Sequence, residues 1–232
     1  MGNVISRNAA INRIRDAAAK TLAKARAFGG EVQSLAEARV ALLLAALDDL
    51  ELRLNQARAT DDGLHATLMA RDSESDLSIC AVCDEIWNAL GRPGQSVDYD
   101  LIVGAGTKVW TDGDPVTQPH LMAVLASNIR NSKHPKLVDQ KEAWATRIDQ
   151  KAAAQAEAAK PTNAAYAEVS VLSMQRRTLA NSIQIALTRL KRDLKNIGMT
   201  EAQVHEIIPD VPVGGSAPPP TPAPPQSSSP ST

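Results

Sequence analysis

Aromatic residues are scarce in this 232-residue chain, which contains three Trp, two Tyr and one Phe. Because aromatic side chains usually supply much of the buried apolar area, we expect a thin compact core. Long uninterrupted apolar runs are missing, so the sequence predicts no membrane-spanning helix. The first residues also lack the apolar segment of a secretory leader. We therefore expect a cytoplasmic protein that is not secreted, and the alanine-rich composition favours a bacterial one.

Cysteine is limited to Cys80 and Cys83, which are too few for a disulfide framework. A structural zinc site needs two further ligands, and a thioredoxin-like site needs a preceding strand that this sequence does not predict. A helical spacing instead relates four residues of this segment, namely Ile79, Cys83, Ile86 and Leu90. We expect both thiols to belong to a core, with metal or redox chemistry as the alternative.

No recognised catalytic pattern is present. The four histidines lie in separate segments, and none has the spacing of a metal-binding helix. Residues 104–108 lack the pattern of a phosphate-binding loop, and no GxSxG turn occurs. Four aspartates between residues 98 and 114 could hold a cation, but they lack an EF-hand pattern and are expected to be solvated. The sequence thus predicts a non-enzymatic protein with no cofactor and no small-molecule substrate.

Charge is balanced overall but unevenly distributed along the chain. Residues 1–30 carry six basic residues and one acidic residue, whereas residues 31–90 carry four basic and twelve acidic residues. We expect the basic N-terminal helix to pair with the acidic segment, within one chain or between subunits. Nucleic acid binding is not expected, because no aromatic stacking platform accompanies the basic residues.

The basic helix also suggests an alternative function, peripheral membrane binding. Four basic residues of this helix could contact a membrane surface or an anion, namely Arg7, Arg13, Lys20 and Lys24. Gly2 lies in a match to the N-myristoylation pattern, and an acyl chain with a basic helix would give two anchoring signals.

Helical periodicity dominates the rest of the chain. Between residues 31 and 59, apolar residues alternate at spacings of four and three, which is a heptad seam typical of coiled coils. Leu43, Leu47 and Leu50 form its middle and are candidate protein-interaction residues. We expect a further helical region over about 62–90, with a break at 71–73. Other helices are expected over about 119–131, 136–159 and 163–197, and a short last helix is expected after a capping box at Thr200.

One segment, about 97–111, alternates with period two and predicts an inserted β-hairpin. With the turn at Ala105, Leu101 would face the protein core, whereas Ile102 and Trp110 would face outward. An outward Trp beside an aliphatic side chain is the kind of anchor that dominates protein interfaces. Ile102 and Trp110 are therefore candidate interaction residues.

The sequence as a whole predicts a mainly α protein, an elongated bundle of coiled-coil-like helices with one hairpin and a disordered, proline-rich C-terminal tail. The expected divisions are a basic helix at 1–30, a helical region with the seam at 31–96, the hairpin at 97–114, a second helical region at 115–210 and the tail at 211–232. The expected function is that of a structural or scaffolding protein, which self-associates or binds a protein partner within a larger assembly.

Overall fold

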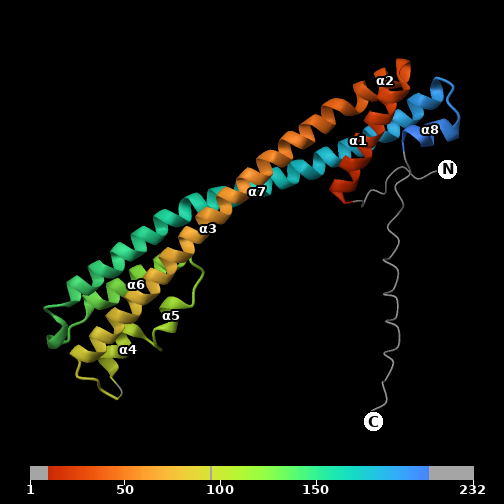
Figure 1. Cartoon of the computed structure of the whole chain (residues 1–232). Helices are drawn as coiled ribbons and strands as arrows, with labels where there is room; N and C mark the ends of the chain where they lie inside the picture. The colour runs from red at the N-terminus through yellow and green to blue at the C-terminus, as the bar shows by residue number, and fades with distance from the viewer. Residues whose placement is uncertain (1–9, 95, 209–232) are drawn as a thin grey trace, which may run out of the picture. The chain divides into compact units, whose positions relative to one another are not determined.

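The computed structural model describes residues 10–94 and 96–208, which are mainly helical (Figure 1). The elements in chain order are α1 (Ile11–Phe28), α2 (Gly30–Ala36), the π-helix η1 (Glu37–Ala41), α3 (Leu42–Ala89), α4 (Val97–Val103), α5 (Lys108–Thr111), α6 (Gln118–Asn131), the 3-10 helix η2 (Pro135–Leu137), α7 (Lys141–Asn196) and α8 (Glu201–Ile207). Gly2, Arg7 and the expected tail at 211–232 lie outside the described residues.

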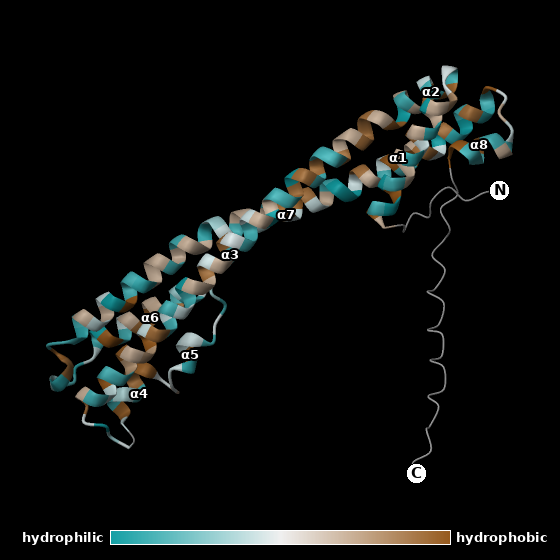
Figure 2. Cartoon of the chain, viewed as in Figure 1, coloured by the Kyte–Doolittle hydropathy of each residue, from teal (hydrophilic) through white to brown (hydrophobic). Residues whose placement is uncertain are grey.

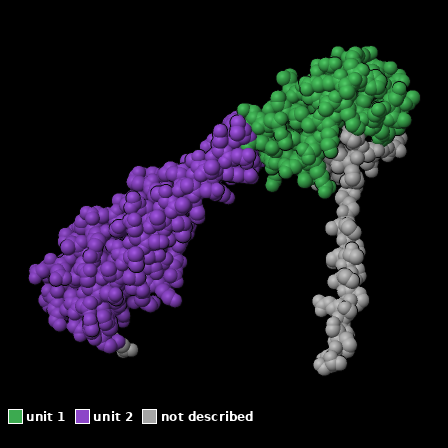
Figure 3. All heavy atoms as spheres, in the orientation of Figure 1, with its two compact units in different colours: residues 1–51, 174–232 green, residues 52–173 purple. Residues whose placement is uncertain are grey.

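The chain divides into two compact units (Figure 3). Unit 1 comprises residues 1–51 and 174–232, and unit 2 comprises residues 52–173. The two long helices, α3 and α7, contribute residues to both units. Hydrophobic and hydrophilic positions are interspersed along both of them (Figure 2), as expected for helices that bury one face and expose the other.

The core of unit 1 confirms that the predicted seam buries a helix face. Leu47 is fully buried, and Leu50 is buried as well, whereas Leu43 is partly buried. Residues from α1, α7 and α8 pack in the same core, whose members include Ile14, Leu22, Val40, Ile183, Leu187, Leu190 and Leu194. The chain's own helices therefore cover the middle of the seam within this unit.

Local sequence signals set several helix ends. Gly29, at φ 79°, ends α1, because a left-handed backbone is readily adopted by glycine. Thr200 begins α8 with a capping box, in which its hydroxyl accepts from the N–H of Gln203 and the Gln203 side chain accepts from the N–H of Thr200. Helix α6 carries Pro119 in its first turn and ends at Asn131.

The predicted β-hairpin is wrong. Residues 97–103 form α4 and residues 108–111 form α5, and no strand occurs among residues 10–94 and 96–208. The hydroxyl of Ser96 accepts from the N–H of Tyr99 and caps the start of α4, while Gly104, at φ 72°, ends it. Two adjacent residues, Ile102 and Val103, are buried, which a helix allows and a half-exposed strand does not.

Three predicted helix breaks, at 60–61, 71–73 and 160–162, are also wrong, because α3 and α7 continue through them. Near residues 71–73, α3 continues without interruption, and Asp72 in this stretch accepts from Nε2 of Gln155 on α7. At Pro161, α7 also continues. The hydroxyl of Thr162 donates to the carbonyls of Ala158 and of Leu64 on α3, which ties this turn of α7 to its neighbour.

Candidate interaction grooves

Burial reverses the predicted roles of the residues around α4 in unit 2. Ile102 is 2 % exposed and Trp110 is 7 % exposed, so the expectation that both face outward is wrong. Val97 and Leu101 are instead 74 % and 72 % exposed. They are four residues apart and therefore share one face of α4. The exposed apolar surface of this segment is thus made by the residues that the hairpin would have buried.

Two side-chain hydrogen bonds hold the C-terminal end of α4 in place. Nε1 of Trp110 donates to the carbonyl of Val103 at 2.7 Å, and Nδ2 of Asn128 donates to the carbonyl of Ile102 at 3.3 Å. These carbonyls lie in the last turn of the helix, where no intrahelical donor is available. Trp110 and Asn128 therefore satisfy the end of α4 and fix its position against α5 and α6.

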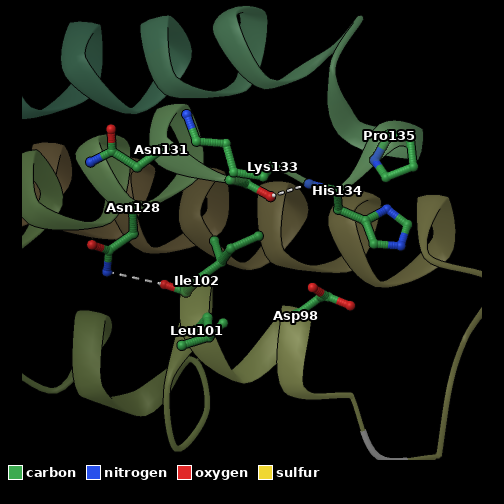
Figure 4. Close-up of a pocket in the computed structure, with 9 residues that line it drawn as sticks. Asp98, Leu101, Ile102, Asn128, Asn131, Lys133, His134 and Pro135 are labelled. Carbon is green, nitrogen blue, oxygen red and sulfur yellow. Dashed lines mark hydrogen bonds between the residues drawn. The ribbon is translucent and has the colours of Figure 1, made fainter.

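A groove, which we call the α4–α6 groove, lies beside α4 and has a volume of about 480 Å³ (Figure 4). Its lining residues come from α4 and from the end of α6 with the connection after it: Asp98, Leu101, Ile102, Asn128, Asn131, Ser132, Lys133, His134 and Pro135. Nδ1 of His134 accepts from the N–H of Lys136, and Oγ of Ser132 accepts from the N–H of His134. The hydroxyl and the imidazole thus order the local backbone, and the groove offers a mixed polar surface beside Leu101.

Unit 1 contains a second groove, which we call the Arg39–Arg189 groove, with a volume of about 470 Å³. One wall is η1 and the start of α3 and the other is α7, and its lining residues are Ala38, Arg39, Leu42, Leu43, Ser182, Ile185, Ala186 and Arg189. Leu42 is 81 % exposed and Ile185 is 52 % exposed. Three consecutive leucines, residues 42–44, cannot all face one narrow core, and Leu42 is the one directed outward.

The rim of this second groove is basic. Nε of Arg39 donates to Asp193 at 2.9 Å, which leaves the other guanidinium nitrogens of Arg39 available. Arg189 is exposed and makes no ion pair within the described residues. The groove therefore combines exposed apolar side chains with one arginine on each wall. Leu42, Ile185 and Arg189 could not be recognised as one site from the sequence, because only the packing of α3 against α7 brings them together.

A buried polar cluster lies elsewhere in unit 2. Nε2 of Gln155 donates to Asp72 at 2.9 Å, and Nε2 of Gln118 donates to Asp76 at 2.6 Å. Burial, followed by the charge of Asp76, raises the pKa of Asp72, and burial also raises the pKa of Asp76. These residues join α3, α6 and α7. Within residues 10–94 and 96–208, no group of three or more His, Cys, Asp or Glu side chains is arranged to hold a metal ion.

The two cysteines differ in environment. Cys83 is fully buried in the core of unit 2, and burial, with smaller contributions from Cys80 and Asp84, raises its pKa to about 12. Cys80 is exposed. The core assignment therefore holds for Cys83 and not for Cys80, while metal or redox chemistry at the pair stays the alternative hypothesis.

The basic residues of α1 fall into two groups. Arg15 pairs with Asp48 at 2.6 Å, and Arg26 pairs with Glu37 at 3.0 Å, so part of the expected pairing with the acidic segment occurs within the chain. Arg13, Lys20 and Lys24 are exposed and form no ion pair with another described residue.

Among the described residues, no helix has a stretch both long enough and apolar enough to pass through a bilayer. Comparisons of this chain with protein-family models, with curated proteins and with solved structures give no match.

Proposed function

We propose that this chain is a non-enzymatic structural or scaffolding protein that self-associates through its exposed helix surfaces. The observation that carries the proposal is the Arg39–Arg189 groove, where the apolar side chains of Leu42 and Ile185 are both exposed. Exposed apolar side chains gathered at one site are typical of surfaces that a partner covers. A thin core with few aromatic residues is consistent with further burial through association.

Sedimentation velocity over a wide range of concentration tests this proposal. The weight-average sedimentation coefficient is expected to rise with concentration and to approach that of a defined oligomer. Leu42→Ser should weaken the association, because it removes an exposed apolar side chain from the groove. Leu52→Ser is the matched control, since Leu52 is 58 % exposed on the same helix but does not line the groove. A monomer at every concentration would contradict the proposal.

Binding to an anionic membrane surface is the second candidate function, and one observation favours it. Arg13, Lys20 and Lys24 are separated by seven and four residues, so they lie within about 40° of each other around the axis of α1. Insertion is less well supported, because Ile14 and Leu22 are buried in the core of unit 1. Flotation with vesicles should depend on anionic lipid and should be lost when these three residues are changed to serine.

A further inference from the structure

We infer that α4 of one copy binds in the Arg39–Arg189 groove of a second copy. This inference rests on the self-association proposed above and names the two surfaces that carry it. The contact would join unit 2 of one copy to unit 1 of another. Three independent observations support it: the pattern of α4, the lining of the groove and the charge of the two units.

Helix α4 has an apolar ridge with a carboxylate on each side. Val97 and Leu101 form the ridge, and both are more than two thirds exposed. At about 100° per residue, Asp98 and Asp100 lie about 80° to either side of the middle of this ridge. Both aspartates are exposed and form no ion pair with another described residue. The free face of α4 is thus an apolar ridge with one carboxylate on each side, and neither carboxylate is in an ion pair with another described residue.

The groove of unit 1 has the opposite arrangement. Its apolar lining includes Leu42 and Ile185, which are 81 % and 52 % exposed, and its two walls carry Arg39 and Arg189. A short helix that packs an apolar ridge against these two apolar side chains would bring its two flanking carboxylates toward the two walls. Arginine is well suited to such a contact, because its planar guanidinium can bind a carboxylate through two parallel hydrogen bonds.

The charge of the two units favours the same pairing. Unit 1 contains 13 basic and 10 acidic residues, a net charge of +3, and unit 2 contains 12 basic and 16 acidic residues, a net charge of −4. Encounter of unit 1 with unit 2 of another copy is therefore attractive, whereas encounter of two like units is repulsive. Complementary charge steers the approach, and the apolar ridge supplies the area that is buried.

A contact between two different surfaces has a consequence that a symmetric patch does not have. Each copy carries one α4 and one groove, so a copy that has lost its groove can still donate its α4 to a copy that has lost its α4. Two variants that are each unable to self-associate should therefore bind each other. A self-complementary patch would not show this behaviour.

The test uses the full chain with two substitutions in exposed positions, Leu101→Asp in α4 and Arg189→Glu in the groove. Each variant alone is expected to weaken self-association by about tenfold or more, as measured by sedimentation. An equimolar mixture of the two should restore a complex that contains one copy of each. Matched controls are Val124→Asp on α6 and Arg192→Glu on α7, both at exposed positions outside the groove, and these should associate as the unchanged chain does.

The outcomes separate the inference from the proposed function. If the unchanged chain stays monomeric, both are wrong. If it associates and the two variants associate equally well, self-association stands but this contact is wrong. Loss in both variants without recovery in the mixture would also overturn the contact, because it indicates one symmetric surface. A reversed pair, Arg189→Glu combined with Asp100→Arg in one chain, should recover part of the lost affinity if the two side chains meet.

Discussion

Replacement of Trp110 by alanine should strongly destabilise unit 2, although the sequence placed this residue at an exposed interface. The side chain is 7 % exposed, lies in the core with Met122 and Leu125, and donates from Nε1 to the carbonyl of Val103 at 2.7 Å. An aromatic side chain buries about 150–250 Å², which at about 25 cal/mol per Å² corresponds to about 4–6 kcal/mol. Partial relaxation of the cavity reduces this, so we expect a loss of about 3–5 kcal/mol in the free energy of unfolding.

Two further variants separate packing from hydrogen bonding. Trp110→Phe keeps most of the buried area but leaves the carbonyl of Val103 without its donor, so a loss of about 1–3 kcal/mol is expected. Leu101→Ala should change the stability of the dilute protein by less than about 0.5 kcal/mol, because Leu101 is 72 % exposed.

Chemical denaturation followed by circular dichroism, at a concentration too low for association, measures all three variants. A larger loss for Leu101→Ala than for Trp110→Ala would refute the helical assignment of residues 97–111, since a hairpin with its turn at Ala105 buries Leu101 and exposes Trp110. Equal and small losses would show that this segment contributes little to the fold. The ranking of the variants therefore decides between the two structures of the segment.

Three other measurements follow from burial and charge. Leu47→Ala should lower the free energy of unfolding by about 2–5 kcal/mol, and Leu47→Asp should lower it further, because it also places a carboxylate in a fully buried position. An unchanged thermal midpoint for Leu47→Asp would contradict the core of unit 1. The pKa of Asp72 is raised in the folded state, so its contribution to stability is present below its ordinary pKa of 3.8 and is lost as the pH rises through its folded pKa. Asp72→Asn should therefore raise the thermal midpoint at pH 7 and have no stabilising effect at pH 3; a lower midpoint at pH 7 would show that the charge is needed. A thiol reagent at pH 8 should modify Cys80 rapidly and Cys83 only on unfolding, and equal rates would contradict the burial that raises the pKa of Cys83 to about 12.

Features that depend on neighbouring residues could be predicted from the sequence. The end of α1 at Gly29, the capping box of α8 and the burial of Leu47 each follow from residues within a few positions of one another. The mainly helical class follows from the same periodicity, since spacings of three and four recur over most of the chain.

Features that depend on tertiary contacts could not be predicted in the same way. Asp72 and Pro161 are ordinary signs of a helix end, but each lies within a long helix, where packing against the opposite helix outweighs the local preference. The hairpin error has a different cause, because an alternation over seven residues also leaves apolar residues four positions apart. Ser96 as a cap and Gly104 as a stop were the local signals for a helix.

The change from hairpin to helix alters the residues that can bind, but it keeps the segment as a candidate interface. With Ile102 and Trp110 buried, the exposed apolar area of this segment is reduced to aliphatic side chains such as Val97 and Leu101. Two aliphatic side chains form a small contact, so an interface built on them needs a concave partner that covers both and pairs the charges beside them. The Arg39–Arg189 groove provides exposed apolar side chains and a cation on each wall, and it lies in the unit of opposite net charge. Because the ridge and the groove are separate surfaces, each copy can donate its α4 to one neighbouring copy and accept the α4 of another.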